Sequence, residues 1–200
     1  MPDAALAEQP AGGWFGYKAI LVPVKAFARA KRRLAPAMSA AERASLAQAM
    51  ATRVVSSAAG LPVAVVCDDP EVATWARSLG ALVIWEPGRG LNGAVQEGVS
   101  RLGQAGADLV VVAASDLPLA TDLRWVTNFP GVTIIPDRRH EGTNVISVPP
   151  AAGFTFSYGP GSFARHLAEA RRVSLPIRVV YSSPLAWDVD VPDDLTAVTR

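Results

Sequence analysis

Three aspartates at the ends of extended stretches are the residues of this sequence best suited to chemistry. Asp116 follows the apolar run 109–115, which is typical of a buried parallel strand. Asp188 and Asp190 lie two positions apart in the stretch 187–191, so in an extended chain both carboxylates face the same way. Converging carboxylates repel one another unless a hard cation lies between them, and Mg²⁺ combines a few carboxylates with water and phosphate oxygens. The pattern predicts an enzyme of metal-assisted phosphate transfer that binds Mg²⁺ through these three aspartates.

A basic loop follows the first predicted strand and carries five Lys or Arg residues within the nine positions 25–33. Ligands of open α/β sheets bind beside the carboxyl ends of the strands, where cationic side chains neutralise charge on a phosphoryl group. We therefore assign Lys25, Lys31 and Arg33 to the triphosphate of a nucleotide, as binding and catalytic residues. A solvated basic turn is the alternative. The sequence contains no Gly-x-x-x-x-Gly-Lys-Ser/Thr motif, which excludes a P-loop.

The glycine loop 88–93 matches the Gly-x-Gly-x-x-Gly fingerprint of dinucleotide-binding proteins, with Asp116 as a suitably spaced acid. A nicotinamide-dependent oxidoreductase is therefore a competing hypothesis. The fingerprint normally follows the first strand of its domain, however, whereas this loop follows the third predicted strand. An oxidoreductase would also make no use of Asp188 and Asp190. We favour a loop that holds a nucleobase, with Asn92 and the backbone at Gly93 at the edge of the base.

A second glycine-rich turn, residues 158–162, precedes a predicted helix that ends near residue 172. Ser162 would cap this helix beside free backbone N–H groups, which suits a phosphate or a carboxylate, and a plain helix cap is the alternative. Thr143 has the form of an ordinary hydroxyl at the start of a strand. His140 and His166 share no ligand spacing, and we expect a structural or surface role for His166.

Strands and helices alternate along the chain, which favours an α/β fold with a mostly parallel, doubly wound sheet. The length of 200 residues suits a single domain, residues 17–200, after a flexible tail at residues 1–16. Strands are expected at 19–24, 63–67, 81–85, 108–114, 132–136 and 177–181, with further candidates at 144–148 and 154–156. Helices are expected from a capping box at Ser39 to about 59, at 70–79, from the glycine loop to about 105, from about 122, at 162–172 and at 192–198.

The composition excludes several classes of partner. A net charge of +1 provides no general field for nucleic acid or for an anionic membrane. The apolar stretches are strand-sized, and the N-terminus lacks the pattern of a secretory signal. We therefore expect a cytoplasmic protein with small-molecule partners and neither nucleic acid nor membrane among them. The oligomeric state is left open, a homo-oligomer included.

Six segments taken together resemble a known family. They are Pro-Val-Lys at 23–25 with Lys-Arg-Arg-Leu at 31–34, Ser-Asp-Leu-Pro-Leu at 115–119, Pro-Asp-Arg-Arg at 136–139, Gly-Thr-Asn at 142–144, Ser-Tyr-Gly-Pro-Gly-Ser-Phe at 157–163 with His166, and Asp-Val-Asp-Val-Pro-Asp-Asp-Leu at 188–195. In this order they are similar to the guanylyltransferases of coenzyme F-420 biosynthesis, which act on phosphoenolpyruvate or 2-phospho-L-lactate. The resemblance covers nearly all of residues 19–195.

The resemblance implies a nucleotidyltransferase fold of the nucleotide-diphospho-sugar transferase type. It also implies a Mg²⁺-dependent reaction of GTP with a phosphorylated three-carbon acid that releases pyrophosphate. By the same resemblance, the three aspartates hold Mg²⁺, and the acid is held by Thr143, Gly159 and Ser162. Sugar-nucleotide relatives often carry a Gly-Gly loop after the first strand, and here Lys25 onwards replaces it, which argues against a sugar phosphate.

Two choices of substrate rest on association. The Ala- and Arg-rich composition resembles high-GC bacterial members of the family, which favours phosphoenolpyruvate, with 2-phospho-L-lactate as the alternative acceptor. The choice of GTP over ATP follows from the resemblance, because Asn92 alone could serve either purine. A further alternative is a silent regulatory domain, which would bind GTP without releasing pyrophosphate.

Overall fold

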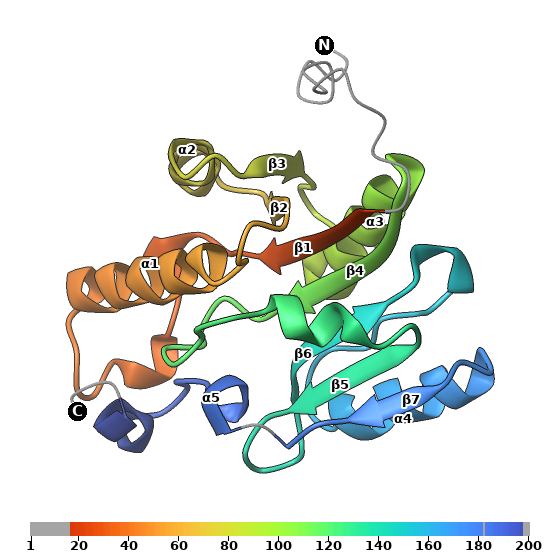
Figure 1. The fold of residues 1–200 in the computed structure, drawn as a ribbon. Coiled ribbons are helices and arrows are strands. Elements are labelled where there is room, and N and C mark those ends of the chain that lie inside the picture. Colours follow the sequence, from red (N-terminus) through yellow and green to blue (C-terminus); the bar gives the residue numbers. More distant parts are fainter. Residues whose placement is uncertain (1–16, 182, 198–200) are drawn as a thin grey trace.

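The computed structural model describes residues 17–181 and 183–197 (Figure 1), so the predicted tail at 1–16 lies outside the described residues. The described chain forms a seven-stranded sheet with the strand order β3-β2-β1-β4-β6-β5-β7. The strands are β1 (Tyr17–Pro23), β2 (Val63–Cys67), β3 (Leu82–Trp85), β4 (Ala107–Ala113), β5 (Val132–Pro136), β6 (Thr143–Val148) and β7 (Ile177–Val179).

Most neighbouring strands are parallel, which confirms the predicted α/β class. The exception is β6, which runs antiparallel to both of its neighbours, β4 and β5. This reversal has a direct consequence for function. Because β6 is antiparallel, its first residue, Thr143, lies at the same edge of the sheet at which the parallel strands β1 and β4 end.

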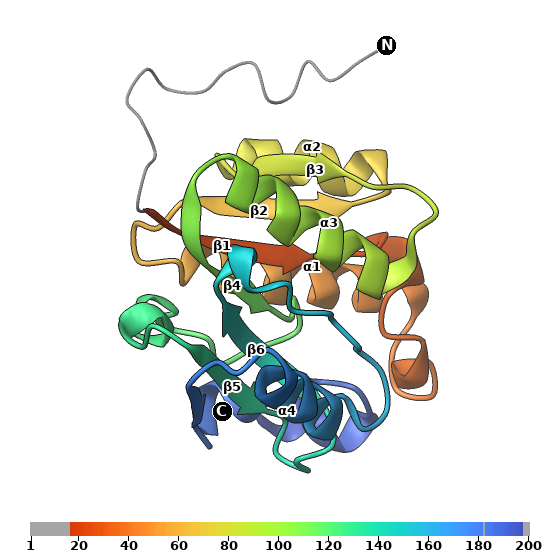
Figure 2. The same cartoon turned by 90° about the vertical axis from the view of Figure 1, so that its right-hand side faces the viewer.

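Helices cover both faces of the sheet (Figures 1 and 2). Alternate residues of β1 explain the arrangement, since Ile20 and Val22 join one buried cluster and Ala19 and Leu21 join the other. The first cluster contains residues of α1 (Ala40–Ser56) and α2 (Pro70–Ser78), and the second contains residues of α3 (Gly90–Gln104) and α4 (Ser162–Arg172). The remaining helical elements are η1 (Phe27–Arg29), η2 (Arg32–Leu34), η3 (Arg124–Asn128), η4 (Pro150–Ala152), α5 (Ser183–Ala186) and η5 (Pro192–Ala197).

A third, smaller cluster fixes the C-terminal segment to the basic loop. Its fully buried members are Leu34 of η2, Met50 of α1 and Val189, with Trp187 among the half-buried residues packed against them. Val189 is 0% exposed, whereas Asp188 and Asp190 on either side are half-buried. The alternation predicted for this stretch is therefore confirmed, with the apolar residue in the core and both aspartates on the opposite side.

The strand predicted at 154–156 was wrong. Phe154 and Phe156 are buried as their apolar character requires, but no strand pairs with them. Side chains of nearby helices accept the backbone hydrogen bonds of this stretch instead. The N–H of Thr155 donates to Glu169, and the N–H of Phe156 donates to Gln96. Burial of alternate residues therefore does not require a β-ladder when nearby helices supply acceptors.

Within residues 17–181 and 183–197, no helix has the length and apolar character needed to cross a membrane.

The predicted capping box of α1 is confirmed. Glu42 N–H donates to Ser39 Oγ at 3.3 Å, and Ser39 N–H donates to Glu42 Oε2 at 2.7 Å. These two bonds satisfy backbone donors that have no partner within the helix. The box thereby fixes the start of the helix that carries Met50 of the third cluster.

Replacement of Ser39 tests this cap. We expect Ser39→Ala to lower the free energy of unfolding by about 1 kcal/mol, because one N–H of the first turn loses its acceptor. Urea denaturation provides the measurement. Ser45→Ala, an exposed change in the middle of the same helix, is the control and should be neutral or slightly stabilising. Equal stability of the two variants would show that the Ser39 hydroxyl contributes nothing to the cap.

Candidate functional site

The candidate site lies where the carboxyl ends of β1 and β4 meet the start of β6. Between β1 and β4 the chain order reverses, since β2 and β3 lie on one side and the later strands on the other. Such switch points open a crevice at the carboxyl edge of a sheet. Here the crevice is a cavity of about 300 Å³, whose polar lining includes Lys25, Lys31, Asp116, Thr143 and Tyr158.

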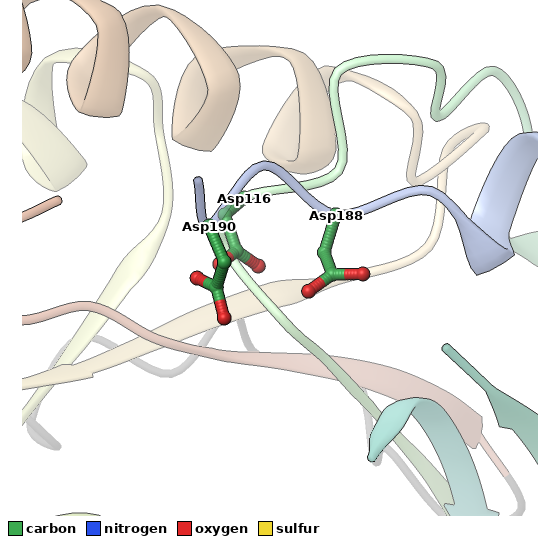
Figure 3. A group of neighbouring side chains, drawn as sticks. All are labelled: Asp116, Asp188 and Asp190. Carbon is green, nitrogen blue, oxygen red and sulfur yellow. The ribbon is translucent and has the colours of Figure 1, made fainter. Parts of the chain in front are cut away.

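The three predicted aspartates come together beside this cavity (Figure 3). Asp116 lies in the loop after β4, and Asp188 and Asp190 flank Val189 in the segment before η5. One carboxylate oxygen from each lies within 4.8 Å of the others, and all three side chains are half-buried. Hard oxygen ligands at this spacing are the type that Mg²⁺ or a similar cation takes. The chain therefore contains an aspartate cluster whose chemistry suits a metal ion.

Lys31 lies between two of these carboxylates. Its ammonium group contacts Asp116 Oδ2 and lies 3.2 Å from Asp190 Oδ1, and Arg33 Nη1 lies 3.8 Å from Asp190 Oδ2. Burial by itself lowers the pKa of Lys31, but the two carboxylates outweigh it and hold the pKa above its ordinary value. Lys31 therefore stays charged and offsets part of the repulsion, whereas the side chain of Arg33 is 76% exposed and lies at the rim.

Asp188 retains charge that no lysine offsets. Burial raises the pKa of Asp188, and the charges of Asp116 and Asp190 raise it further. Asn144 of β6 is a weak donor to Asp188, because its Nδ2 lies 3.5 Å from Asp188 Oδ1 and also donates to the carbonyl of Leu185 at 3.0 Å. The cluster thus carries more negative charge than Lys31 cancels, and a divalent cation would relieve this excess.

Asp194 holds the segment that carries two of the three aspartates. Its buried carboxylate, 1% exposed, accepts the backbone N–H of Asp190 at 2.7 Å and of Val191 at 2.9 Å through Oδ2. Oδ1 accepts from the guanidinium group of Arg138, which also lies over the ring of Trp187, 4.2 Å from its centroid. The sequence analysis assigned no role to Asp194 or Arg138. The only signal was their position in two of the six segments that resemble the guanylyltransferase family, because the contact joins residues 56 positions apart.

The three residues expected to hold the acid lie close together around α4. Thr143 is 6% exposed and lines the cavity. Gly159 has φ +116, a backbone conformation that favours glycine, and two neighbouring carbonyls, those of Ser157 and Pro160, accept from the guanidinium group of Arg165. Ser162 is buried at the start of the helix. Gly159 and Ser162 do not themselves line the cavity, which reaches this region at Tyr158.

The cap predicted for α4 was wrong in detail. The N-cap is Gly161, with φ +72, and Ser162 is the first helical residue without a side-chain capping bond. The first N–H groups are not all free either, because Ser162 N–H donates to Gly159 O at 3.0 Å and Phe163 N–H donates to Glu141 O at 3.1 Å. Only a glycine adopts this left-handed N-cap at little cost, which explains the change of capping residue.

Asn92 forms hydrogen bonds within the protein. Its Oδ1 accepts the N–H of Tyr158 at 2.6 Å, and its Nδ2 lies 3.4 Å from the carbonyl of the same residue. Both polar groups of the amide thus hold the turn that precedes α4. Gly93 follows within α3, where an added Cβ would lie 2.9 Å from Arg89 Cβ. Contacts of Asn92 and Gly93 with a nucleobase stay a prediction that no contact in this structure supports.

A second cavity of about 150 Å³ adjoins the first and shares Lys25 with it. Its lining also includes Arg29, Asp68, Glu86 and Gly90, at the carboxyl ends of β1, β2 and β3. Glu86 is 6% exposed and is held by Arg101 at 2.5 Å and Arg89 at 3.0 Å. Lys25, which is exposed, therefore lies at the junction of two neighbouring compartments, one of which contains Asp116.

Comparisons with known proteins agree with this geometry. The family described as "Guanylyl transferase CofC like" matches residues 18–199. The phosphoenolpyruvate guanylyltransferase of Rubrobacter xylanophilus is 39% identical over 184 residues, covering 88% of this chain and 90% of its own. That of Sphaerobacter thermophilus is 35% identical, with 88% and 89% covered. Nothing in these matches supports the oxidoreductase hypothesis.

The fold has relatives among solved structures. A proposed nucleotide-diphospho-sugar transferase from Desulfovibrio desulfuricans superimposes with a TM-score of 0.73 at 18% identity, covering 93% of this chain and 87% of the other. At this identity the likeness concerns the fold alone. It confirms the fold type expected from the sequence.

Replacement of Asp194 tests the support of the aspartate segment. We expect Asp194→Asn to lower the free energy of unfolding by about 3 kcal/mol, because the change breaks a buried ion pair and leaves Arg138 without its carboxylate. Asp108→Asn, which removes the same charge from an exposed position of β4, should change it by less than about 0.5 kcal/mol. Urea denaturation of both variants decides, and a fully stable Asp194 variant would refute the supporting role.

Proposed function

Because the chain belongs to the guanylyl transferase family described as CofC like, we propose that it joins GTP and phosphoenolpyruvate. The products would be enolpyruvyl-diphospho-5'-guanosine and pyrophosphate, in coenzyme F-420 biosynthesis as the resemblance implies. The observation that carries this proposal is the grouping of Asp116, Lys25, Lys31 and Thr143 around one cavity, with Asp188 and Asp190 beside Asp116. A cation site, ammonium groups and a hydroxyl donor are what a triphosphate and a phosphorylated acid would need.

The aspartate cluster supports Mg²⁺ as the metal. Its ligands are carboxylate oxygens only, which suits a hard cation, and Mg²⁺ combines carboxylates with phosphate oxygens and water. Asp116, Asp188 and Asp190 would hold the ion. When bound, Mg²⁺ would neutralise charge on the triphosphate and make the α-phosphorus more electrophilic.

The basic residues would neutralise the negative charge on the triphosphate that the metal ion leaves. Lys25 lies at the junction of the two cavities, which suits a contact with the triphosphate between base and acceptor. Lys31 forms ion pairs with two of the carboxylates that would bind a metal ion. We therefore propose that its ammonium group exchanges a carboxylate for a phosphate oxygen when GTP binds. Arg33 at the rim would contact the β- and γ-phosphates, which leave as pyrophosphate.

The reaction needs no general base from the protein. A phosphate oxygen of the acceptor would attack the α-phosphorus of GTP, forming one O–P bond as the bond to the bridging oxygen of pyrophosphate breaks. A phosphate monoester has a second pKa of about 6, so the nucleophile is already anionic at neutral pH. The task of the side chains is then to position two anions against each other, which can supply about 7–11 kcal/mol of the barrier reduction.

The choice of acceptor rests on the relatives. Those described above are named for phosphoenolpyruvate. Phosphoenolpyruvate and 2-phospho-L-lactate share the phosphate and the carboxylate that Thr143, Gly159 and Ser162 would hold, and they differ in the carbon skeleton between them. We propose phosphoenolpyruvate as the acceptor, with 2-phospho-L-lactate as the alternative.

Pyrophosphate release provides the first test. The protein is incubated with GTP and Mg²⁺ and with phosphoenolpyruvate, 2-phospho-L-lactate or no acceptor. We expect release that requires Mg²⁺ and phosphoenolpyruvate. Release with 2-phospho-L-lactate alone would correct the acceptor, and binding of GTP without any release would indicate a silent nucleotide-binding domain instead of a transferase.

Loss of one carboxylate tests the metal assignment. Asp188→Asn keeps the size of the side chain but removes a charged ligand, and we expect kcat to fall at least about a hundredfold, since metal ions supply several kcal/mol of stabilisation at the transition state. Asp108→Asn is the matched control and should retain wild-type turnover. The measurement is turnover across a Mg²⁺ titration. Wild-type kcat of the Asp188 variant at saturating Mg²⁺ would refute the assignment.

A further inference from the structure

His166 is a buried histidine that connects the parts of the expected acid site. It lies within α4 and is 0% exposed, which fits the structural role expected as one alternative and rules out the surface role. Its Nε2 lies 3.0 Å from the backbone N of Ser157, and its Nδ1 lies 3.0 Å from Thr143 Oγ1. Aromatic rings surround the imidazole, those of Phe154, Phe156 and Tyr158, with centroids at 5.8, 6.2 and 4.9 Å.

The hydrogen bonds determine which nitrogen carries the proton. Burial lowers the pKa of His166 to about 4, and the charge of Arg165 adds to this effect, so the ring is neutral near pH 7. A neutral imidazole has one donor and one acceptor nitrogen. Since Ser157 N–H can only donate, Nε2 is the acceptor and the proton belongs to Nδ1. The Nδ1–H group must therefore donate to Thr143 Oγ1.

This donation orients the hydroxyl group of Thr143. With one lone pair of Oγ1 taken by His166, the hydroxyl hydrogen has to find an acceptor elsewhere. Among the described residues, His166 is the only hydrogen-bond partner of this hydroxyl. Thr143 also lines the larger cavity. The hydroxyl is thus a free donor beside the space in which an anion would bind, and carboxylates and phosphates accept such hydrogen bonds strongly.

We propose that His166 is a positioning residue that fixes the Thr143 hydroxyl as a donor to the acid substrate. This inference rests on the proposed function. One imidazole would then connect all three residues expected to hold the acid: Thr143 directly, Gly159 through Ser157, and Ser162 through the first turn of α4. An unfixed hydroxyl could instead present its lone pair to the anion, which is repulsive.

Two variants separate the two hydrogen bonds of the imidazole. The amide of glutamine reaches roughly the position of Nε2, so His166→Gln can still accept from Ser157 N–H but donates nothing to Thr143. The amide of asparagine reaches roughly the position of Nδ1, so His166→Asn can still donate to Thr143 but leaves Ser157 N–H without its acceptor. A histidine that only fills the core would show no such asymmetry.

Steady-state kinetics with phosphoenolpyruvate and GTP provide the test. We expect His166→Gln to raise the KM for phosphoenolpyruvate roughly tenfold or more, the effect of one hydrogen bond to a charged group, with the KM for GTP changed less than about twofold. His166→Asn should lie closer to the wild type. In a Thr143→Val background, His166→Gln should have no further effect, because the hydroxyl it acts through is already gone.

Several outcomes would overturn the inference. These are equal rises of both KM values, additive effects of the two substitutions, and an asparagine variant as impaired as the glutamine variant. A ¹⁵N NMR spectrum of the wild-type imidazole gives a readout that does not depend on activity, and a proton on Nε2 instead of Nδ1 would refute the proposal. A wild-type protein that is inactive with every acceptor would refute the proposed function itself, and this inference with it.

Discussion

The site depends on holding three carboxylates within 4.8 Å of one another. Two unit charges about 4 Å apart repel by about 4 kcal/mol near a protein surface, so the rest of the molecule must oppose this repulsion. It does so in three ways: Lys31 supplies a positive charge, the burial of Val189 fixes the direction of its two neighbours, and Asp194 accepts the backbone N–H groups of the same segment. Lys31 comes from the basic loop after β1, whereas Val189 and Asp194 belong to the C-terminal segment itself.

The part of the cavity at Thr143 and Tyr158 is built without charge pairs among the described residues. Thr143 lies at the edge of the sheet where β1 and β4 end because β6 runs antiparallel between β4 and β5. Around it, neutral groups perform the positioning: His166 bonds Thr143 and Ser157, and Asn92 bonds Tyr158 on both sides of its peptide unit. A cation would be drawn to the charged half, and an anion would meet oriented donors in the neutral half. The two halves thus suit the two ends of one phosphoryl transfer.

Several parts of the site could be read from the sequence because their signals are local. The apolar run before Asp116, the alternation around Val189 and the capping box at Ser39 each depend on a few neighbouring residues, and all three predictions were confirmed. The errors arose where a local pattern had more than one solution. Phe154 and Phe156 alternate like a strand, yet helix side chains accept from the backbone N–H groups of Thr155 and Phe156. The turn before α4 has a glycine cap where a serine was expected.

The tertiary structure alone decided which of these residues meet. Lys31 reaches Asp116 and Asp190 across separations of 85 and 159 positions, and no propensity or spacing acts over such distances. The reversed direction of β6 is likewise a property of the whole sheet, and with it the position of Thr143. The sequence by itself was sufficient for the class of fold, the limits of most elements and the aspartates suited to a metal. Their convergence, and the link from His166 to Thr143, required the packing of the complete chain, because long-range contacts form only when all the faces that bury them are present.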